Sequence, residues 1–343
     1  MTTYKEIRGT NIEAVASDPS NPVEGQVWYN TTTNVVKGLS NNTGTWASGN
    51  NMNTGRRFLG GAGTQTAALG FGGYVGPFSG LTESYNGTNW TEVADLNLAR
   101  TNTAGTGASN TAALAIGGEA ATETPTNKFF TESWNGSSWT EVGDLSSEKK
   151  RGAGVGTNTA ALAFEQINTE LYNGTNWSEV GNMNGNREKL AGAGISTAAL
   201  GFGGTPFSAL TELWNGSSWT ELNNMNTARA SLSSAGTSST AALGFGGGSS
   251  VGNTEDWNGA SWAEVADLNT GRQDFAGAGI QTAALAFGGE NPNASVDANT
   301  ETWNGTSWTE VGNMNTARYA LSGAGTNTAG LAFGGEPTSN ATE

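Results

Sequence analysis

Residues 190–222 read LAGAGISTAALGFGGTPFSALTELWNGSSWTEL, and this stretch decides the fold. It begins with a run of small residues that leads into TAALGFGG at 197–204. It ends with TELWNGSSWTEL at 211–222, which has Asn215 and Gly216 at its centre. An Asn-Gly pair favours a tight hairpin turn because both residues tolerate a positive φ. The stretch therefore predicts two consecutive β-hairpins, which together make the four short strands of a propeller blade.

The same pattern recurs along the chain in fixed register. One Trp marks each copy, Asn or Asp follows five positions later, an apolar residue six later and a basic residue ten later. The spacing between these Trp residues is about 44 residues, which is typical of propeller repeats. The repeated Trp residues are Trp46, Trp90, Trp139, Trp177, Trp219, Trp262 and Trp308. The repeated basic residues are Arg56, Arg100, Lys149, Arg187, Arg229, Arg272 and Arg318.

Seven copies predict an all-β chain that folds as a seven-bladed β-propeller of four-stranded blades. The first Trp hairpin, residues 35–47, precedes every small-residue hairpin, and the last small-residue hairpin ends near Gly335. We therefore expect residues 35–47 to supply the outer strands of a last blade whose inner strands are residues 319–335. Such pairing of N-terminal and C-terminal strands would close the ring. The expected domains are an N-terminal extension, 1–34, and the propeller, 35–343.

The composition argues against several function classes. The formal net charge of −15 disfavours nucleic acids and anionic membranes as partners, because binding to either needs a basic surface. The chain has no Cys and no His, which removes thiolate zinc sites, Cys nucleophiles and His-based triads. It has no long apolar run and no signal-peptide core at its N-terminus. We therefore expect no metal, no cofactor and no export by a standard signal.

The repeat resembles the kelch family over residues 35–336. A kelch unit has a Gly-Gly doublet closing the second strand, an aromatic residue on the third, a Trp opening the fourth and an Arg beyond it. Here these positions read Gly203-Gly204, Trp214, Trp219 and Arg229. The resemblance implies a propeller. It is imperfect, because the turn between the two aromatic residues is short and the third copy has Phe164-Glu165 in place of Gly-Gly.

We interpret the repeated residues as structural. The aromatic pairs, such as Trp134 and Trp139, are expected to fill the space between blades; carbohydrate binding is the alternative. The basic residue is expected to pair with a Glu such as Glu221 or with turn carbonyls, rather than to line an anion-binding ring. The Glu two positions after each Trp is absent only from the first copy, and these carboxylates are too widely spaced for a cation site. The Asn-Gly-Ser/Thr sequences are expected to be turns rather than glycosylation acceptors.

Ligand binding is expected on the variable connection that follows each Gly-Gly, because function tends to lie on variable loops of a rigid scaffold. The aromatic residues of these connections are the candidate ligand-binding residues: Tyr74, Phe78, Phe129, Phe130 and Phe207. Packing of each side chain onto its own blade is an equally open interpretation.

The segment PVEGQVWYNTTTNVVKG at 22–38 resembles an N-terminal segment of structural proteins from tailed phages. The resemblance implies a non-enzymatic virion protein, such as a tail fibre, a receptor-binding part or a decoration protein. Its N-terminal arm would bind other virion proteins, and its propeller would bind a glycan or protein of the host surface. It would be assembled in the cytoplasm and found in the virion or outside the cell.

Two other function classes stay open. The first is a bacterial extracellular kelch-like adhesin or carbohydrate-binding propeller. The second is an enzyme, which we do not expect: kelch copper oxidases need His ligands and a Cys-modified Tyr, and sialidase-type propellers need Asp-box turns that the sequence does not show. Glycosidase chemistry that uses carboxylates alone is compatible with the composition.

Overall fold

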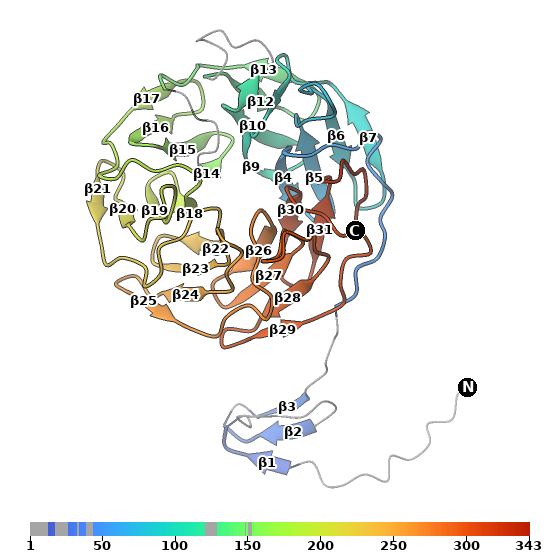
Figure 1. The fold of residues 1–343 in the computed structure, drawn as a ribbon, viewed down its shortest axis with the longest axis vertical. Helices are drawn as coiled ribbons and strands as arrows, with labels where there is room; N and C mark the ends of the chain where they lie inside the picture. Colours follow the sequence, from blue (N-terminus) through green and yellow to red (C-terminus); the bar gives the residue numbers. More distant parts are fainter. Residues whose placement is uncertain are drawn as a thin grey trace. The chain divides into compact units, whose positions relative to one another are not determined.

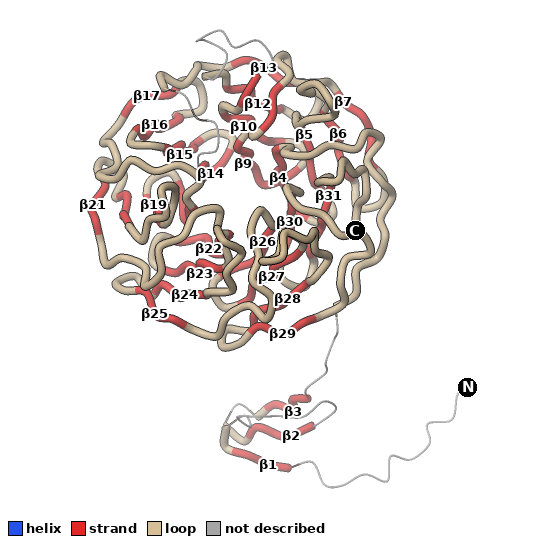
Figure 2. Tube along the Cα trace, viewed as in Figure 1, coloured by secondary structure: helices blue, strands red, loops and turns tan. Residues whose placement is uncertain are grey.

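The computed structural model describes residues 13–17, 27–32, 34–38, 44–120, 129–147, 149 and 153–343. The chain divides into two compact units, Met1–Gly44 and Thr45–Glu343. The described residues form strands, turns and loops (Figure 2), and they contain no helix that could cross a membrane. The expectation of an all-β propeller is confirmed, with the corrections given below.

The N-terminal unit contains one small sheet. Its strands are β1 (Glu13–Val15), β2 (Val27–Asn30) and β3 (Val35–Gly38). Strand β1 runs parallel to β2, and β3 pairs with β2 in antiparallel register. Residues 35–38 therefore have their partner in this unit. The expectation that residues 35–47 form the outer strands of the last blade is wrong for this segment, and residues 39–43 lie outside the described residues.

The second unit is a ring of antiparallel blades, each running outward from the centre in chain order (Figure 1). The first three blades are β4 (Gly60–Thr64), β5 (Ala67–Phe71), β6 (Thr82–Tyr85), β7 (Trp90–Val93); β9 (Ala104–Ser109), β10 (Ala112–Ile116), β12 (Thr131–Trp134), β13 (Trp139–Glu141); and β14 (Ala153–Thr157), β15 (Ala160–Glu165), β16 (Asn168–Tyr172), β17 (Trp177–Glu179). The next three are β18 (Ala191–Ile195), β19 (Ala198–Phe202), β20 (Thr211–Trp214), β21 (Trp219–Glu221); β22 (Ser233–Ser238), β23 (Ala241–Phe245), β24 (Thr254–Trp257), β25 (Trp262–Glu264); and β26 (Ala276–Ile280), β27 (Ala283–Phe287), β28 (Thr300–Trp303), β29 (Trp308–Glu310). Two further strand pairs are β8 (Arg100–Thr101) with β11 (Glu119–Ala120), and β30 (Ser322–Gly325) with β31 (Gly330–Phe333).

The prediction of seven four-stranded blades is wrong, because the residues that the structure describes form six. The seventh small-residue hairpin forms only the two-stranded sheet β30–β31. The ring of inner strands is nevertheless continuous, since β30 lies beside both β26 and β4 (Figure 1). The physical reason for the error is the choice of partner: β3, which was expected to extend this hairpin, pairs with β2 instead.

Short contacts between the two ends of the second unit complete this part of the ring. Thr342 forms an isolated antiparallel bridge with Phe333. On its other side, the Gly49 amide donates to the Thr342 carbonyl at 2.8 Å, and the Met52 amide donates to the Asn340 carbonyl at 2.8 Å. Residues from the start of the unit therefore run along residues from its end, without forming a fourth strand.

Small residues line the centre of the ring because the inner strands of adjacent blades come very close together. A Cβ atom added to Gly105 would lie 2.3 Å from the carbonyl oxygen of Gly61 in the preceding blade. Large residues instead fill the space between blades farther out. The ring centroids of Phe202 and Trp262, from the fourth and fifth blades, are 4.8 Å apart. The core is thus a series of interblade clusters.

Candidate functional site

Each repeated Trp is tied to a neighbouring blade. Its indole Nε1 donates to the hydroxyl of a Thr at 2.8–2.9 Å. In six cases this Thr lies on the third strand of a blade and precedes a Glu, and for Trp90 it is Thr342. For example, Trp262 donates to Thr211 of the fourth blade. All of these Trp side chains except Trp46, which is partly buried, are buried. The six buried Trp residues therefore serve interblade packing and present little surface to a sugar.

The repeated Arg residues lie in the interior and line no open anion site. Arg187 Nη2 contacts Glu212 Oε1 at 2.6 Å, and its Nη1 donates to the carbonyls of Gly203 and Leu210. Burial lowers the pKa of the Arg187 guanidinium from its ordinary value, and the Glu212 carboxylate opposes that shift. The expected partner Glu221 is exposed and does not take part. The same buried pairing links Arg56–Glu83, Arg100–Glu132, Arg229–Glu255, Arg272–Glu301 and Arg318–Glu343.

The third copy, which has Lys in place of Arg, makes a weaker version of this contact. Lys149 Nζ lies 3.5 Å from Glu170 Oε1 and donates to the hydroxyl of Ser147. The ammonium group is a compact donor, so it does not reproduce the two-pronged geometry of a guanidinium.

The sequence contains a repeated signal for these partners that spacing from the Trp did not reveal. A Thr-Glu pair lies within the first three residues of the third strand of each blade and recurs at the end of the chain. The Thr accepts from a Trp and the Glu accepts from an Arg or Lys. The pairs are Thr82-Glu83, Thr131-Glu132, Thr169-Glu170, Thr211-Glu212, Thr254-Glu255, Thr300-Glu301 and Thr342-Glu343.

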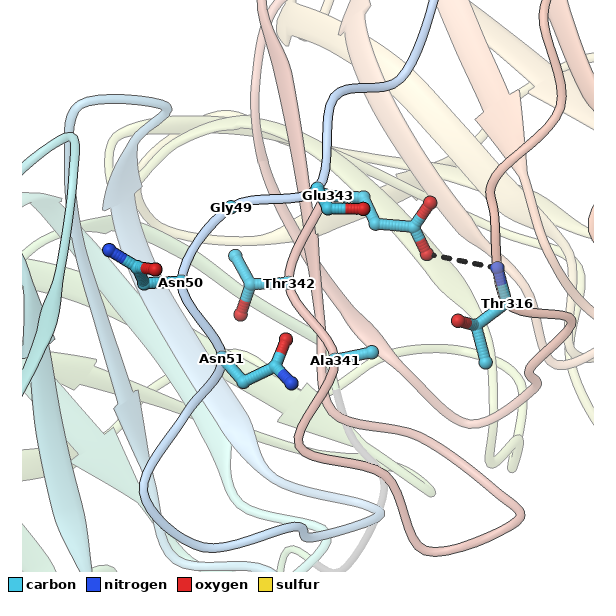
Figure 3. Close-up of a pocket in the computed structure, with 8 residues that line it drawn as sticks. Gly49, Asn50, Asn51, Thr316, Ala341, Thr342 and Glu343 are labelled. Atoms are coloured by element: carbon cyan, nitrogen blue, oxygen red, sulfur yellow. Dashed lines mark hydrogen bonds between the residues drawn. The ribbon is translucent and has the colours of Figure 1, made fainter.

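A cavity of about 370 Å³ lies where the two ends of the ring meet (Figure 3). Ser48, Gly49, Asn50 and Asn51 line one side, and Ala341, Thr342 and Glu343 line another. Glu343 accepts from the Thr316 amide at 3.2 Å and pairs with Arg318 at 3.0 Å. Since Thr342 and Glu343 of this cavity hold Trp90, Thr316 and Arg318 at the junction of the two ends, we assign the cavity to the seam.

The variable connections after Gly-Gly begin beside the residues that follow each repeated Arg. Isolated bridges join Tyr74 to Arg57, Thr205 to Glu188 and Glu290 to Gln273. Because the bridges are equivalent from blade to blade, the connections emerge on the same face of the ring. We call the connections 74–80, 119–130, 166–167, 205–209, 248–253 and 290–299 the loop face; residues 121–128 lie outside the described residues.

The five candidate aromatic residues differ in exposure. Phe207 is 59% exposed. Tyr74 and Phe78 are half-buried and pack against each other, with ring centroids 5.9 Å apart, and the Arg57 guanidinium lies 5.0 Å from the Tyr74 ring. Phe129 and Phe130 are also half-buried: Phe129 packs against an interblade core cluster, and the carbonyl of Phe130 accepts from Arg100. The structure therefore does not gather the five into one site, and it leaves Phe207 as the most accessible.

Two exposed apolar residues of the loop face are not among the predicted residues, because both are aliphatic and the prediction was confined to aromatic side chains. Ile167 is 43% exposed and follows β15, and Val296 is 36% exposed and lies between β27 and β28. Both occupy the same connection as Phe207 in their own blades. The signal that could have found them is an apolar residue in the one connection whose length and sequence vary between copies.

Within the part of the chain that the structure describes, no three Asp or Glu side chains come together as a group that could hold a metal ion. The Glu residues two positions after the Trp residues are exposed on the outer strands, as Glu92, Glu221 and Glu264 show. These carboxylates follow the circumference of the ring, one to a blade.

Comparison with known proteins bears on the fold. No family model matches the chain, and no curated protein matches it in sequence. Among the solved structures that resemble it is one titled "Structure of YjhT", which aligns over 77% of this chain and 99% of its own with a TM-score of 0.58 and 11% sequence identity. At this identity the similarity shows the β-propeller fold alone.

Proposed function

We propose that the protein is a non-enzymatic binding scaffold of a tailed-phage virion, and that its loop face binds a glycan or protein of the host surface. The binding role rests on the different positions of the repeated and the variable residues. The repeated Trp and Arg residues form hydrogen bonds and ion pairs in the interior, as Trp262 and Arg187 show. The connection that varies between copies carries the exposed apolar side chains Ile167, Phe207 and Val296. A rigid ring with variable, accessible loops suits recognition.

The virion role is supported by the resemblance of residues 22–38 to phage structural proteins. The division of the chain into Met1–Gly44 and Thr45–Glu343 is compatible with an arm that attaches to other virion proteins and a ring that is displayed. In this proposal, the virion protein to which the arm attaches determines whether the chain is a tail fibre, a receptor-binding part or a decoration protein.

A glycan array probed with the full chain tests the binding role. We expect discrete glycan or glycoprotein signals that Phe207→Ser and Ile167→Ser weaken. Ile195→Ser is the matched control, because Ile195 is 53% exposed but is the last residue of β18, at the end of the inner strands opposite the loop face. Equal loss of signal in the control and the two loop variants would show that the loop face is not the binding surface.

The non-enzymatic role is tested by incubating the protein with polysaccharides bound on the array and assaying new reducing ends. We expect none; a steady, protein-dependent release would establish a hydrolase. The virion role is tested by cryo-EM and mass spectrometry of purified particles. We expect the N-terminal unit against the particle and the ring displayed. A particle-bound ring with a free N-terminus would overturn that arrangement.

A further inference from the structure

The exposed ring of Phe207 lies against the main chain of the neighbouring blade. Phe207 belongs to the connection between β19 and β20 of the fourth blade, and it is 59% exposed. A Cβ atom added to Gly248, in the equivalent connection of the fifth blade, would lie 2.6 Å from Phe207 Cε1 and 2.9 Å from its Cζ. Only a residue without a side chain allows the ring to come this close. One end of the ring is therefore supported by the fifth blade, while most of the side chain stays open to solvent.

The supporting segment, residues 248–250, is fixed from two directions. The Gly248 amide donates to the carbonyl of Ala230, in the loop before β22, at 2.6 Å. The Ser250 hydroxyl donates to the carbonyl of Glu290, in the sixth-blade connection, at 3.0 Å. Ser249 and Ser250 have φ of 66° and 51°, and such left-handed conformations of residues other than Gly persist only where the surrounding contacts determine them. Ser250 is buried and Ser249 is exposed, so the fixed segment presents the Ser249 side chain directly after the glycine that supports Phe207.

The exposed residues that border Phe207 are polar. Thr205, two residues earlier, is exposed and forms an isolated antiparallel bridge with Glu188. Glu188 is also exposed, and its carboxylate accepts from Gln166 Nε2 at 3.1 Å. Groups that donate or accept hydrogen bonds therefore belong both to the fourth-blade segment that leads to Phe207 and, at Ser249, to the fifth-blade segment that supports it.

The small extent of this apolar surface favours a sugar over a protein as the ligand. The other exposed apolar residues of the loop face, Ile167 and Val296, belong to the third and sixth blades. A stable protein interface buries about 800 Å² per partner around a core that is depleted in charged residues, and one ring among polar side chains does not supply such a core. A pyranose ring, by contrast, has a face of positively polarised C–H groups, which the negative face of an aromatic ring attracts, and a border of hydroxyl groups.

We propose that Phe207 stacks against one pyranose ring of a host-surface glycan, and that the Ser249 hydroxyl forms a hydrogen bond with the same sugar. This assignment rests on the proposed function, since it names the ligand class and the contact residues of the loop face. Gly248 is a positioning residue, because it contacts the Phe207 ring and holds it in place for the sugar.

Saturation-transfer nuclear magnetic resonance with the full chain tests the stacking. The probes are the methyl β-glycosides of galactose, glucose and mannose. Galactitol is the control ligand, because it has the hydroxyl groups of galactose but no ring. We expect saturable binding of at least one glycoside, with the strongest transfer to the C–H protons of one ring face, and no binding of galactitol. Binding of none of the glycosides, or equal binding of galactitol, overturns the proposal.

Substitutions separate ring stacking from a general apolar contact. Phe207→Trp should preserve or strengthen glycoside binding, whereas Phe207→Leu, which stays apolar but lacks a flat ring, should weaken it about twofold to tenfold. Gly248→Ala should weaken it as much, because the added Cβ displaces the ring, and its φ lies outside the left-handed region, so Ala is compatible with the main chain. Ser249→Ala should weaken binding about twofold to tenfold, through the loss of one hydrogen bond.

Ile195→Ser is again the control and should leave glycoside binding unchanged, and unchanged thermal unfolding would show that the variants are folded. Wild-type affinity in Phe207→Leu or in Gly248→Ala overturns the proposal. The proposed function fails on a different result, which is equal loss of array signal in Ile195→Ser and the loop variants. A signal that Phe207→Ser weakens but Phe207→Leu retains would keep the loop face as the binding surface and reject the stacking.

Discussion

At the scale of single residues, the buried Arg–Glu pairs explain why the same two residue types recur in each blade. Each guanidinium is removed from water, and it keeps its charge because a carboxylate and at least one main-chain carbonyl accept from it. Arg229, for example, donates to Glu255 and to the carbonyls of Gly246 and Asn253. Burial alone lowers the pKa of Arg229, and Glu255 opposes the shift. Removing one partner would leave an uncompensated charge in the interior.

Glu255→Gln and Glu264→Gln test this explanation as a matched pair. The two residues lie opposite each other on β24 and β25, but Glu255 is buried and Glu264 is exposed. We expect Glu255→Gln to lower the free energy of unfolding by about 3–5 kcal/mol and Glu264→Gln to change it by less than about 0.5 kcal/mol. Denaturant unfolding monitored by Trp fluorescence measures both. Similar values for the two variants would contradict the structural role of the pair.

Because of Lys149, the free energy of unfolding of the ring changes with pH in the alkaline range. Burial lowers its pKa below the ordinary value of 10.5, and Glu170 opposes the shift. Between the lowered pKa and 10.5, the unfolded chain holds a proton that the folded chain has released. This group therefore makes the free energy of unfolding rise with pH across that window.

Lys149→Arg isolates this contribution, because Arg does not titrate in the window. We expect the free energy of unfolding of the wild type, minus that of Lys149→Arg, to increase between neutral pH and pH 10.5. Urea titrations at several pH values measure the difference. A difference that is constant or decreases with pH would show that Lys149 keeps its proton as readily in the folded chain as in the unfolded chain.

The sequence showed that the basic residues recur at one position of the repeat, but it did not identify the Glu residues that pair with them. The Arg is ten positions after the Trp in every copy with Arg, which indicates a structural role. The partner Glu212 and the exposed Glu221 are both Glu residues repeated at fixed positions of one hairpin. Spacing alone cannot show which of two opposite Glu residues faces the interior, because that depends on how the neighbouring blade covers the strand.

At the scale of elements, the turn residues and the short strand patterns of the sequence correctly predicted the two hairpins of each blade. Asn215 and its equivalents accept from the amides two and three residues ahead, which fixes the turn and leaves the side chain engaged. The local signal failed for residues 35–38. A hairpin pattern specifies a turn and a strand length, but β3 could pair with either β2 or the last small-residue hairpin.

The bonds between elements of adjacent blades predict a measurable coupling. Thr211→Val removes the acceptor of the buried Trp262 indole and should lower the free energy of unfolding by about 1–3 kcal/mol, because the N–H group is left unsatisfied. Thr220→Val is the control, since Thr220 is exposed on β21 of the same blade. The effect should disappear when Trp262 is first replaced by Phe. Equal destabilisation in both backgrounds would mean that the hydroxyl acts through another contact.

At the scale of the whole molecule, the repeat count predicted a closed ring but not the number of complete blades. The repeated Trp occurs in seven copies, yet the described residues form six blades of four strands. Counting repeats cannot reveal how much of an incomplete copy becomes a strand, because strand assignment depends on the backbone pairing at the seam. The seam instead uses separate main-chain bonds, of Gly49 with Thr342 and of Met52 with Asn340.

Trp46 connects the start of the ring to the sixth blade. Its indole donates to Thr300 at 2.8 Å, and its ring centroid lies 5.1 Å from that of Phe287. We expect Trp46→Ala to lower the free energy of unfolding of the ring by about 3–5 kcal/mol, as for large-to-small changes in a core. Tyr29→Ala, in the N-terminal unit, should leave ring unfolding unchanged, and calorimetry of both variants measures the contrast.

Thermal unfolding of two shortened chains tests the closure of the ring most directly. The chain 45–343 keeps Trp46 and the bonds of Gly49 and Met52, whereas the chain 53–343 lacks them all. We predict that 45–343 unfolds in one cooperative transition at the temperature of the full-length ring. We predict that 53–343 unfolds at a much lower temperature and over a broader range. If 53–343 unfolds as 45–343 does, residues 45–52 do not close the ring, and the seam described here is wrong.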